Sequence, residues 1–295
     1  MNRTHTQGYL FGLGAVLIWS GFILVSRLGG ISPLLSYDII AIRYVTCATL
    51  VFPVWVFWKR FNVFQVKFLV CSLIGGLGYA LLAFYGFKTT SASHAAVLLP
   101  GLLPIFITLL SAFFKTEQHL LSKWLGIGVI SAGVALLFWH ELRLTGVLSL
   151  GHLSLMGAAL CWAMFSVLIN RWHIRPWEAT ISLALITCMI YLPVYLLFLP
   201  KAISMNLLHE IAIQAFYQGF MATILQMLLY VRAVQLIGAA NMGAMMAIVP
   251  ILAGFSAIAI FHEELSVALM AALFLVSIGV WLANSQFEFT RNVRA

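Results

Sequence analysis

The chain has 295 residues, of which 63% are hydrophobic and 8% are charged, and its formal net charge is +8. Soluble domains carry about 25% charged residues, so this composition excludes a water-soluble fold. It predicts an integral membrane protein whose apolar surface faces lipid.

Ten apolar runs follow one another along the chain, and each is long enough to cross the hydrocarbon core as a helix. They lie near residues 8–27, 35–58, 67–88, 91–114, 121–139, 149–170, 178–199, 208–232, 238–261 and 266–284. The runs do not alternate apolar and polar residues, as the strands of a membrane barrel would. Their linkers are too short for a further domain. We therefore expect an all-α integral membrane protein with one membrane domain, residues 1–295.

The basic residues are unevenly divided between the two ends of the predicted helices. The amino-terminal side receives eleven of them, Arg3, Lys59, Arg60, Lys67, Lys115, Lys123, Arg171, Arg175, Arg232, Arg291 and Arg294, and the other side receives four, Arg27, Lys88, Arg143 and Lys201. Cytoplasmic loops carry the excess of Lys and Arg, which predicts that both termini are cytoplasmic and that the protein lies in the cell's inner membrane. The positive charge is thus a topology signal, and we expect no nucleic-acid partner.

The two halves of the chain repeat one another. "GAVLIWSGFILVSR" (14–27) resembles "GAALCWAMFSVLINR" (157–171), and Trp19 matches Trp162 at an offset of 143 residues. At an offset of 146, Pro104 matches Pro250 and Glu117 matches Glu263. The repeats span about residues 8–139 and 149–284. Five helices is an odd number, so the second repeat must enter the membrane from the opposite side, which gives the inverted architecture of many secondary transporters.

These features resemble the drug/metabolite transporter superfamily, in its EamA-type branch. The resemblance rests on the first apolar phrase, on Arg43 within "IAIRYVTCATL", on Pro104, and on Glu117 followed by "WLGIGVISAGVAL"; the second half repeats it with Pro250, "HEEL" and "SIGVWLANS". It implies a central cavity lined mainly by helices 1, 3, 4, 6, 8 and 9, and export of amino acids, other metabolites or toxic amphipathic compounds. The second half has no arginine that matches Arg43.

Two tryptophans lie near the middle of their predicted helices rather than at the membrane surface, where tryptophan is usually found. Trp19 and Trp162 could wall a cavity and stack on a ring or a cation. The alternative is packing between helices.

Proline residues inside two predicted helices indicate kinks. Pro100 and Pro104 lie in the fourth helix and Pro250 in the ninth. Proline removes a backbone hydrogen bond, and a freed carbonyl is tolerated only where the helix faces protein or a wet cavity. We interpret these residues as shaping or moving a gate, with a static kink as the alternative.

Polar side chains within the predicted spans are further candidates for substrate contact, because lipid does not tolerate them unpaired. They are Tyr79, His94, Gln218, Gln226, Tyr230 and Asn241. The alternative for each is a hydrogen bond between helices. His94 could also couple a proton, because histidine changes charge near neutral pH; a satisfied or exposed histidine is the alternative.

Three charged residues are expected to have structural roles. Arg43, about two turns into the second helix, could reach towards the surface or pair with another helix. Glu117 and Glu263 precede the fifth and tenth helices, where negative charge favours a helix start. The stretches 126–133 and 273–279 are rich in small residues, which predicts close packing between helices.

The sequence therefore predicts a secondary exporter of small organic solutes, working by alternating access at a cavity between the repeats. Neutral or aromatic amino acids, or related metabolites, are the expected substrates, because the candidate cavity holds aromatic and neutral polar groups and no fixed acid. Efflux of amphipathic or cationic toxic compounds is the alternative, followed by a membrane enzyme on lipid-linked substrates and a gated channel. We expect no catalytic residues, metal or cofactor; the partners are the substrate and the bilayer, and the protein is a monomer or homodimer.

Overall fold

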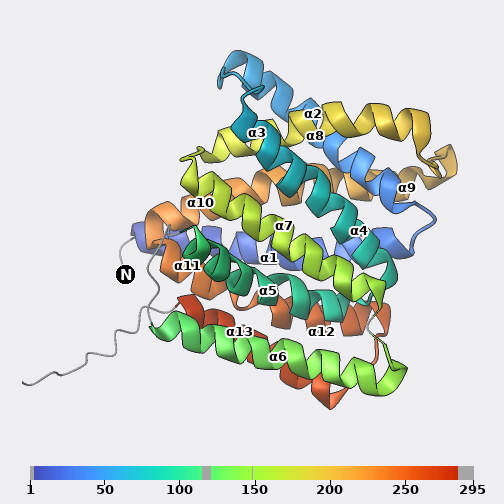
Figure 1. Cartoon of the computed structure of the whole chain (residues 1–295). Helices are drawn as coiled ribbons and strands as arrows, with labels where there is room; N and C mark the ends of the chain where they lie inside the picture. The colour runs from blue at the N-terminus through green and yellow to red at the C-terminus, as the bar shows by residue number, and fades with distance from the viewer. Residues whose placement is uncertain (1–2, 115–120, 148, 285–295) are drawn as a thin grey trace, which may run out of the picture.

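The computed structural model describes residues 3–114, 121–147 and 149–284, and these residues form helices and connecting turns without strands (Figure 1). Ten helices or helix series are long and apolar enough to cross a membrane, as the sequence predicts. Their elements are α1 (Arg3–Ile31), α2 (Ser36–Phe57), α3 (Val66–Cys71), η1 (Ser72–Gly78), α4 (Tyr79–Thr89), α5 (Ala92–Phe113), α6 (Leu121–Thr145), α7 (Leu150–Arg171), α8 (Pro176–Phe198), η2 (Met205–Leu207), α9 (Leu208–Gln214), η3 (Ala215–Leu225), α10 (Gln226–Ile237), α11 (Ala239–Met246), α12 (Val249–Phe261) and α13 (Val267–Asn284).

Acidic side chains stabilise the starts of α2 and α8. Asp38 in the first turn of α2 accepts a hydrogen bond from the Leu35 backbone N–H at 2.8 Å. Glu178 in the first turn of α8 accepts one from the Arg175 N–H at 3.0 Å. Each carboxylate satisfies a backbone donor that the helix itself leaves open, and its negative charge favours the helix amino terminus.

The third and eighth spans each contain a π-helical segment. In the third span, α3 passes through η1 into α4, and in the eighth, α9 passes through η3 into α10. The segments begin at Ser72 and Ala215, which are 143 residues apart, the offset that aligns Trp19 with Trp162. Wide turns of this kind are rare and occur often at functional sites.

The two proline-containing spans differ in backbone conformation. The helix α5 is continuous through Pro100 and Pro104. In the ninth span α11 ends at Met246, and α12 begins at Val249 with Pro250 in its first turn. Proline fits a first turn because its missing N–H would have no helical partner there. The ninth span is thus interrupted just before Pro250, whereas α5 continues through both of its prolines.

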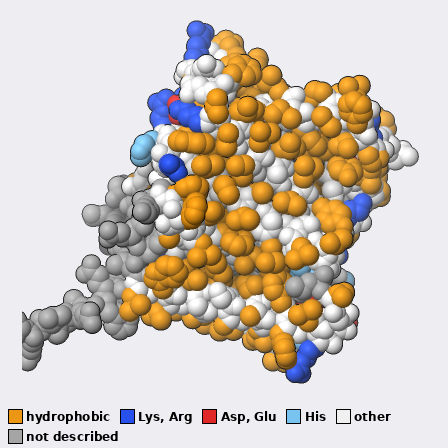
Figure 2. All heavy atoms as spheres, in the orientation of Figure 1, with side chains coloured by type: hydrophobic (Ala, Val, Ile, Leu, Met, Phe, Trp, Pro, Cys, Tyr) orange, Lys and Arg blue, Asp and Glu red, His pale blue; other side chains and the backbone are white. Residues whose placement is uncertain are grey.

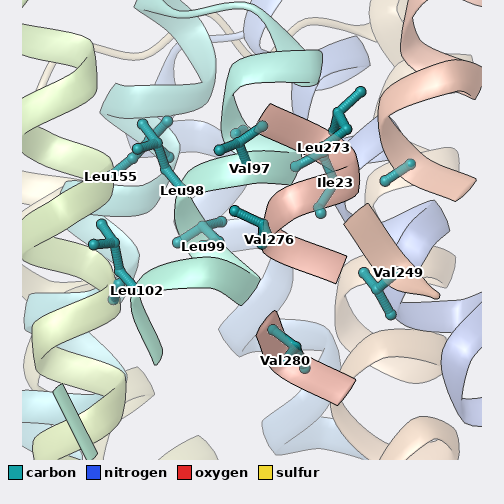
Figure 3. Packing of buried hydrophobic residues seen from close by; sticks show 14 of the residues in the cluster. Ile23, Val97, Leu98, Leu99, Leu102, Leu155, Val249, Leu273, Val276 and Val280 are labelled. Atoms are coloured by element: carbon teal, nitrogen blue, oxygen red, sulfur yellow. The ribbon is translucent and has the colours of Figure 1, made fainter. Parts of the chain in front are cut away.

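The bundle has its closest helix pairing at one side, where α6 and α13 run together, while α2 and α8 pack together at the opposite side (Figure 1). Glycine permits the close approach of α6 and α13. A side chain at Gly126 would meet the Gly279 carbonyl oxygen at 2.6 Å, so the predicted packing seam is confirmed. The main core contains buried residues of α1, α4, α5, α6, α7, α12 and α13, among them Ile23, Leu98, Leu155, Val249 and Val276 (Figure 3).

The surface of the bundle matches a lipid environment. Hydrophobic side chains cover the middle of the face in Figure 2, and Lys and Arg lie towards its edges. Many large apolar side chains are exposed, including Leu17, Phe52, Phe198 and Ile260. A water-soluble protein would not expose apolar patches of this extent.

Candidate functional site

Aromatic side chains of the first, third and sixth spans belong to the main core or pack against it. The rings of Tyr79 and Trp162 lie 5.0 Å apart, and Trp162 lies 5.0 Å from Phe165. On α1, Trp19 lies 6.3 Å from Phe22. Trp19 and Trp162 are only partly buried although both pack against the main core, and Tyr79 belongs to that core. The structure thus brings Tyr79 and Trp162 into contact and places Trp19 against the same core.

A buried polar network lies beside these rings. The Arg43 guanidinium donates from Nη1 to Gln218 Oε1 at 3.1 Å, and Gln218 Nε2 donates to Ser26 Oγ at 2.9 Å. Arg43 also lies over the ring of Phe22, 5.5 Å from its centroid. The network connects α2, the π-helical segment η3 and α1. Arg43 therefore pairs with another helix, one of the two arrangements that the sequence left open.

The charge of Arg43 has no acidic partner among the described residues. Arg43 is 5% exposed, and its Nε has no hydrogen-bond partner in the described part of the chain. The ion pairs that the structure records involve Glu141 and Glu178 instead. A buried charge that is bonded only to neutral groups is unfavourable in a low-dielectric interior, and such residues in membrane spans are usually functional.

Side-chain hydroxyls donate hydrogen bonds to backbone carbonyls of both π-helical segments. Tyr44 donates to the Gly76 carbonyl at 2.9 Å, and Thr223 donates to the Gln218 carbonyl at 2.6 Å. Tyr79 and Gln226 are the first residues after η1 and η3. Two of the predicted candidates thus follow a π-helical segment directly, and a third, Gln218, lies within one.

The remaining neutral polar candidates lie towards the end of the bundle at which the chain begins. Gln226 and Tyr230 are partly buried on α10, and Tyr230 packs against the main core. Asn241 is exposed, and its amide donates to the Ile237 carbonyl of the preceding turn at 2.7 Å. The structure does not bring Asn241 to the aromatic rings.

His94 lies away from the aromatic rings, in a cluster at the opposite end of the molecule from the amino terminus. Its Nδ1 is 3.0 Å from His152 Nε2, and its Nε2 is 3.6 Å from Glu141 Oε1. His152 and Glu141 were not among the sequence candidates. The spacing "SASH" and "SLGH" was the available signal, because it places each histidine three residues after a serine that caps its helix.

Glu263 stabilises the start of a helix, but not of the helix that follows it. Its carboxylate accepts from the backbone N–H groups of Ala92 and Ser93 on α5, at 2.6 and 2.8 Å. The first turn of α13 is capped by Ser266 instead, whose hydroxyl accepts from the Leu269 N–H. The matching residue of the first repeat, Glu117, lies outside the described residues.

An open cavity of about 670 Å³ lies where the second and eighth spans end and the seventh begins. It is lined by Trp58, Trp177 and several basic residues, including Arg60 and Arg232. It contains none of the predicted substrate-binding residues.

Comparison with known proteins identifies the class. The EamA-like transporter family matches residues 6–139 and 149–285, which is nearly the whole chain, so this protein belongs to that family. Ten membrane-length helices agree with a multi-pass membrane transporter.

Particular relatives are distant. The chain is 22% identical to the uncharacterized transporter YoaV of Bacillus subtilis (strain 168) over 233 residues, which cover 76% of this chain and 77% of YoaV. A protein known from its crystal structure has the same fold, with a TM-score of 0.63 and 21% identity, over 94% of this chain and 96% of its own.

Proposed function

We propose that this protein exports neutral or aromatic amino acids, or related carboxylate-bearing metabolites, across the cytoplasmic membrane as a secondary transporter. The substrate would bind near Trp19, Tyr79 and Trp162. The observation that carries the proposal is the uncompensated charge of Arg43, which lies over the ring of Phe22, the neighbour of Trp19 on α1. A substrate carboxylate would supply the negative charge that the described protein groups do not, and the rings would bind an apolar or aromatic side chain.

Several features support alternating access between two inverted repeats. The two segments that match the family have nearly the bounds of the predicted repeats. The segments η1 and η3, the carboxylates Asp38 and Glu178, and the helix pair α6 and α13 occupy corresponding places in the two halves. The fourth and ninth spans differ, because only the ninth is broken near its proline. Alternating access requires two related repeats that differ in conformation and can exchange these conformations.

Efflux of toxic cations is the second candidate, since the faces of Trp19 and Trp162 could attract a cation. The positive charge of Arg43, which lies 5.5 Å from the centroid of the Phe22 ring, opposes the binding of a cation there. A membrane enzyme ranks lower, because the aromatic region holds no cluster of ionisable groups among the described residues.

Counterflow in proteoliposomes tests the proposal. Vesicles would be loaded with an unlabelled amino acid, and entry of labelled tryptophan, phenylalanine or leucine would be followed. We expect saturable uptake that is stimulated by internal substrate and that falls at least tenfold in Trp19→Ala and Trp162→Ala. The substitution Gln218→Glu would give Arg43 a protein carboxylate, so we expect it to weaken amino-acid binding without loss of folding.

Arg175→Gln is the control, because Arg175 is an exposed residue outside the spans. It should leave uptake unchanged. Uptake of lipophilic cations in place of amino acids would refute the substrate class. Saturable uptake that is indifferent to both tryptophans would refute the location of the site.

A further inference from the structure

The cluster of His94, Glu141 and His152 lies where α5 and α7 begin and α6 ends, apart from the aromatic region. We propose that it binds a divalent transition-metal ion of the Zn²⁺, Cu²⁺ or Ni²⁺ type. One potential ligand atom from each residue lies within 4.8 Å of the others. Imidazole nitrogens suit these ions, whereas Mg²⁺ and Ca²⁺ prefer sites made of oxygen atoms.

The two imidazoles face one another as a pair of ligands would. His94 Nδ1 and His152 Nε2 are 3.0 Å apart. A Zn²⁺ ion about 2.0–2.1 Å from each nitrogen in tetrahedral geometry needs them about 3.3 Å apart. Small side-chain rotations are therefore enough to admit the ion.

The second nitrogen of each ring faces an oxygen atom. His94 Nε2 is 3.6 Å from Glu141 Oε1, and His152 Nδ1 is 2.8 Å from Ser149 Oγ. Metal-binding histidines are characteristically held in this way, with the nitrogen that does not bind the ion fixed by a carboxylate or another oxygen group. Glu141 thus orients His94 from behind, and the two histidines supply the protein ligands.

The charges around the cluster have opposing effects on a cation. The starts of α5 and α7 carry partial positive charge, which opposes binding. The carboxylate of Glu141 lies against His94, and the carboxylate of Glu263 occupies the start of α5. His140 is a further ionisable group near His94. Because two carboxylates offset the helix termini, we expect Glu141 to be needed for binding.

The surroundings leave a path for the ion and for water ligands. The side chains of His94 and Glu141 are each 16% exposed, while His152 is 3% exposed. An ion would enter past His94 and Glu141, and water would complete its coordination. Once bound, it would hold the ends of α5 and α7 together, with α6 attached through Glu141.

Metal titration of the purified full-length protein tests the site. After treatment with a chelator, Zn²⁺ or Cu²⁺ would be added and the heat of binding measured. We expect one ion per chain, with binding at least tenfold weaker in His94→Asn and in His152→Gln. Glu141→Gln should weaken it by about 10–100-fold, as loss of such supporting groups does. His209→Ala is the control, since His209 is an exposed histidine outside the cluster.

A second readout separates metal binding from a folding defect. Bound Cu²⁺ should give an electron paramagnetic resonance spectrum with coupling to two imidazole nitrogens, and this coupling should disappear in either histidine variant that still elutes as a folded protein. The proposal is overturned by the absence of a stoichiometric site in the unmodified protein. Binding that persists unchanged in both histidine variants would also overturn it.

Discussion

Glu263 joins two helices that are far apart in the sequence. Its carboxylate bonds two backbone N–H groups at the start of α5, although it lies just before α13. Charged acceptors at a helix amino terminus stabilise it through both hydrogen bonding and the helix dipole. Loss of this charge should therefore loosen the start of α5.

We expect Glu263→Gln to lower the free energy of unfolding by about 1–2 kcal/mol, since the amide keeps an acceptor but loses the charge. Thermal unfolding in detergent would measure this. Glu264→Gln is the control, because Glu264 is the exposed neighbouring carboxylate. Equal effects of the two substitutions would contradict the role of Glu263.

Individual residues were predictable only in part. Mid-span position was enough to select Tyr79 and Trp162, whose rings meet at 5.0 Å. The partnership of Arg43 with Gln218 was not predictable, because the two are 175 residues apart and their contact depends on how three helices rotate about their axes. His152 and Glu141 were missed for the same reason, since each looks like a surface residue until α5, α6 and α7 are packed.

The close packing of helix α6 against helix α13 depends on glycine. At Gly126 an added side chain would lie 2.4 Å from the Ala283 backbone nitrogen and 2.6 Å from the Gly279 carbonyl oxygen. Backbone atoms of a helix cannot move aside as a flexible side chain can. The two helices would have to separate.

We expect Gly126→Ala to destabilise the protein by about 1–3 kcal/mol through this overpacking. Gly128→Ala is a matched control two residues away, where an added side chain would meet nothing within 4 Å. It should be neutral or stabilise by up to about 1 kcal/mol through helix propensity. Thermal unfolding of the three proteins under one set of detergent conditions gives the comparison, and similar midpoints for both variants would refute the packing seam.

The helices themselves were predictable because their length and composition are fixed by the thickness of the bilayer. All ten expected runs correspond to membrane-length helices. The π-helical segments were not predictable, since hydropathy does not report hydrogen-bond register. The continuity of α5 through two prolines also depends on packing, because neighbouring helices can satisfy the groups that proline leaves open.

For the whole molecule, the predicted topology can be tested directly. The turn around Asn62 joins the second and third spans, and Lys201 lies between the seventh and eighth. If both termini are cytoplasmic, these positions lie on opposite sides of the membrane. In intact cells, we expect a membrane-impermeant maleimide to label Lys201→Cys and not Asn62→Cys. Labelling of Asn62→Cys alone would show that the termini lie on the opposite side of the membrane. Labelling after the cells are permeabilised is the control that each cysteine can react.

The π-helical segments also change the directions in which the side chains that follow them point. One residue corresponds to about 100° of rotation in an α-helix, and a π-helix places more residues in each turn. A helical wheel drawn without interruption through the third or eighth span therefore assigns the wrong direction to side chains after Ser72 or Ala215. Conversion of η1 to α-helical bonding would turn α4 about its own axis relative to α3. Tyr79 would then face a different neighbour.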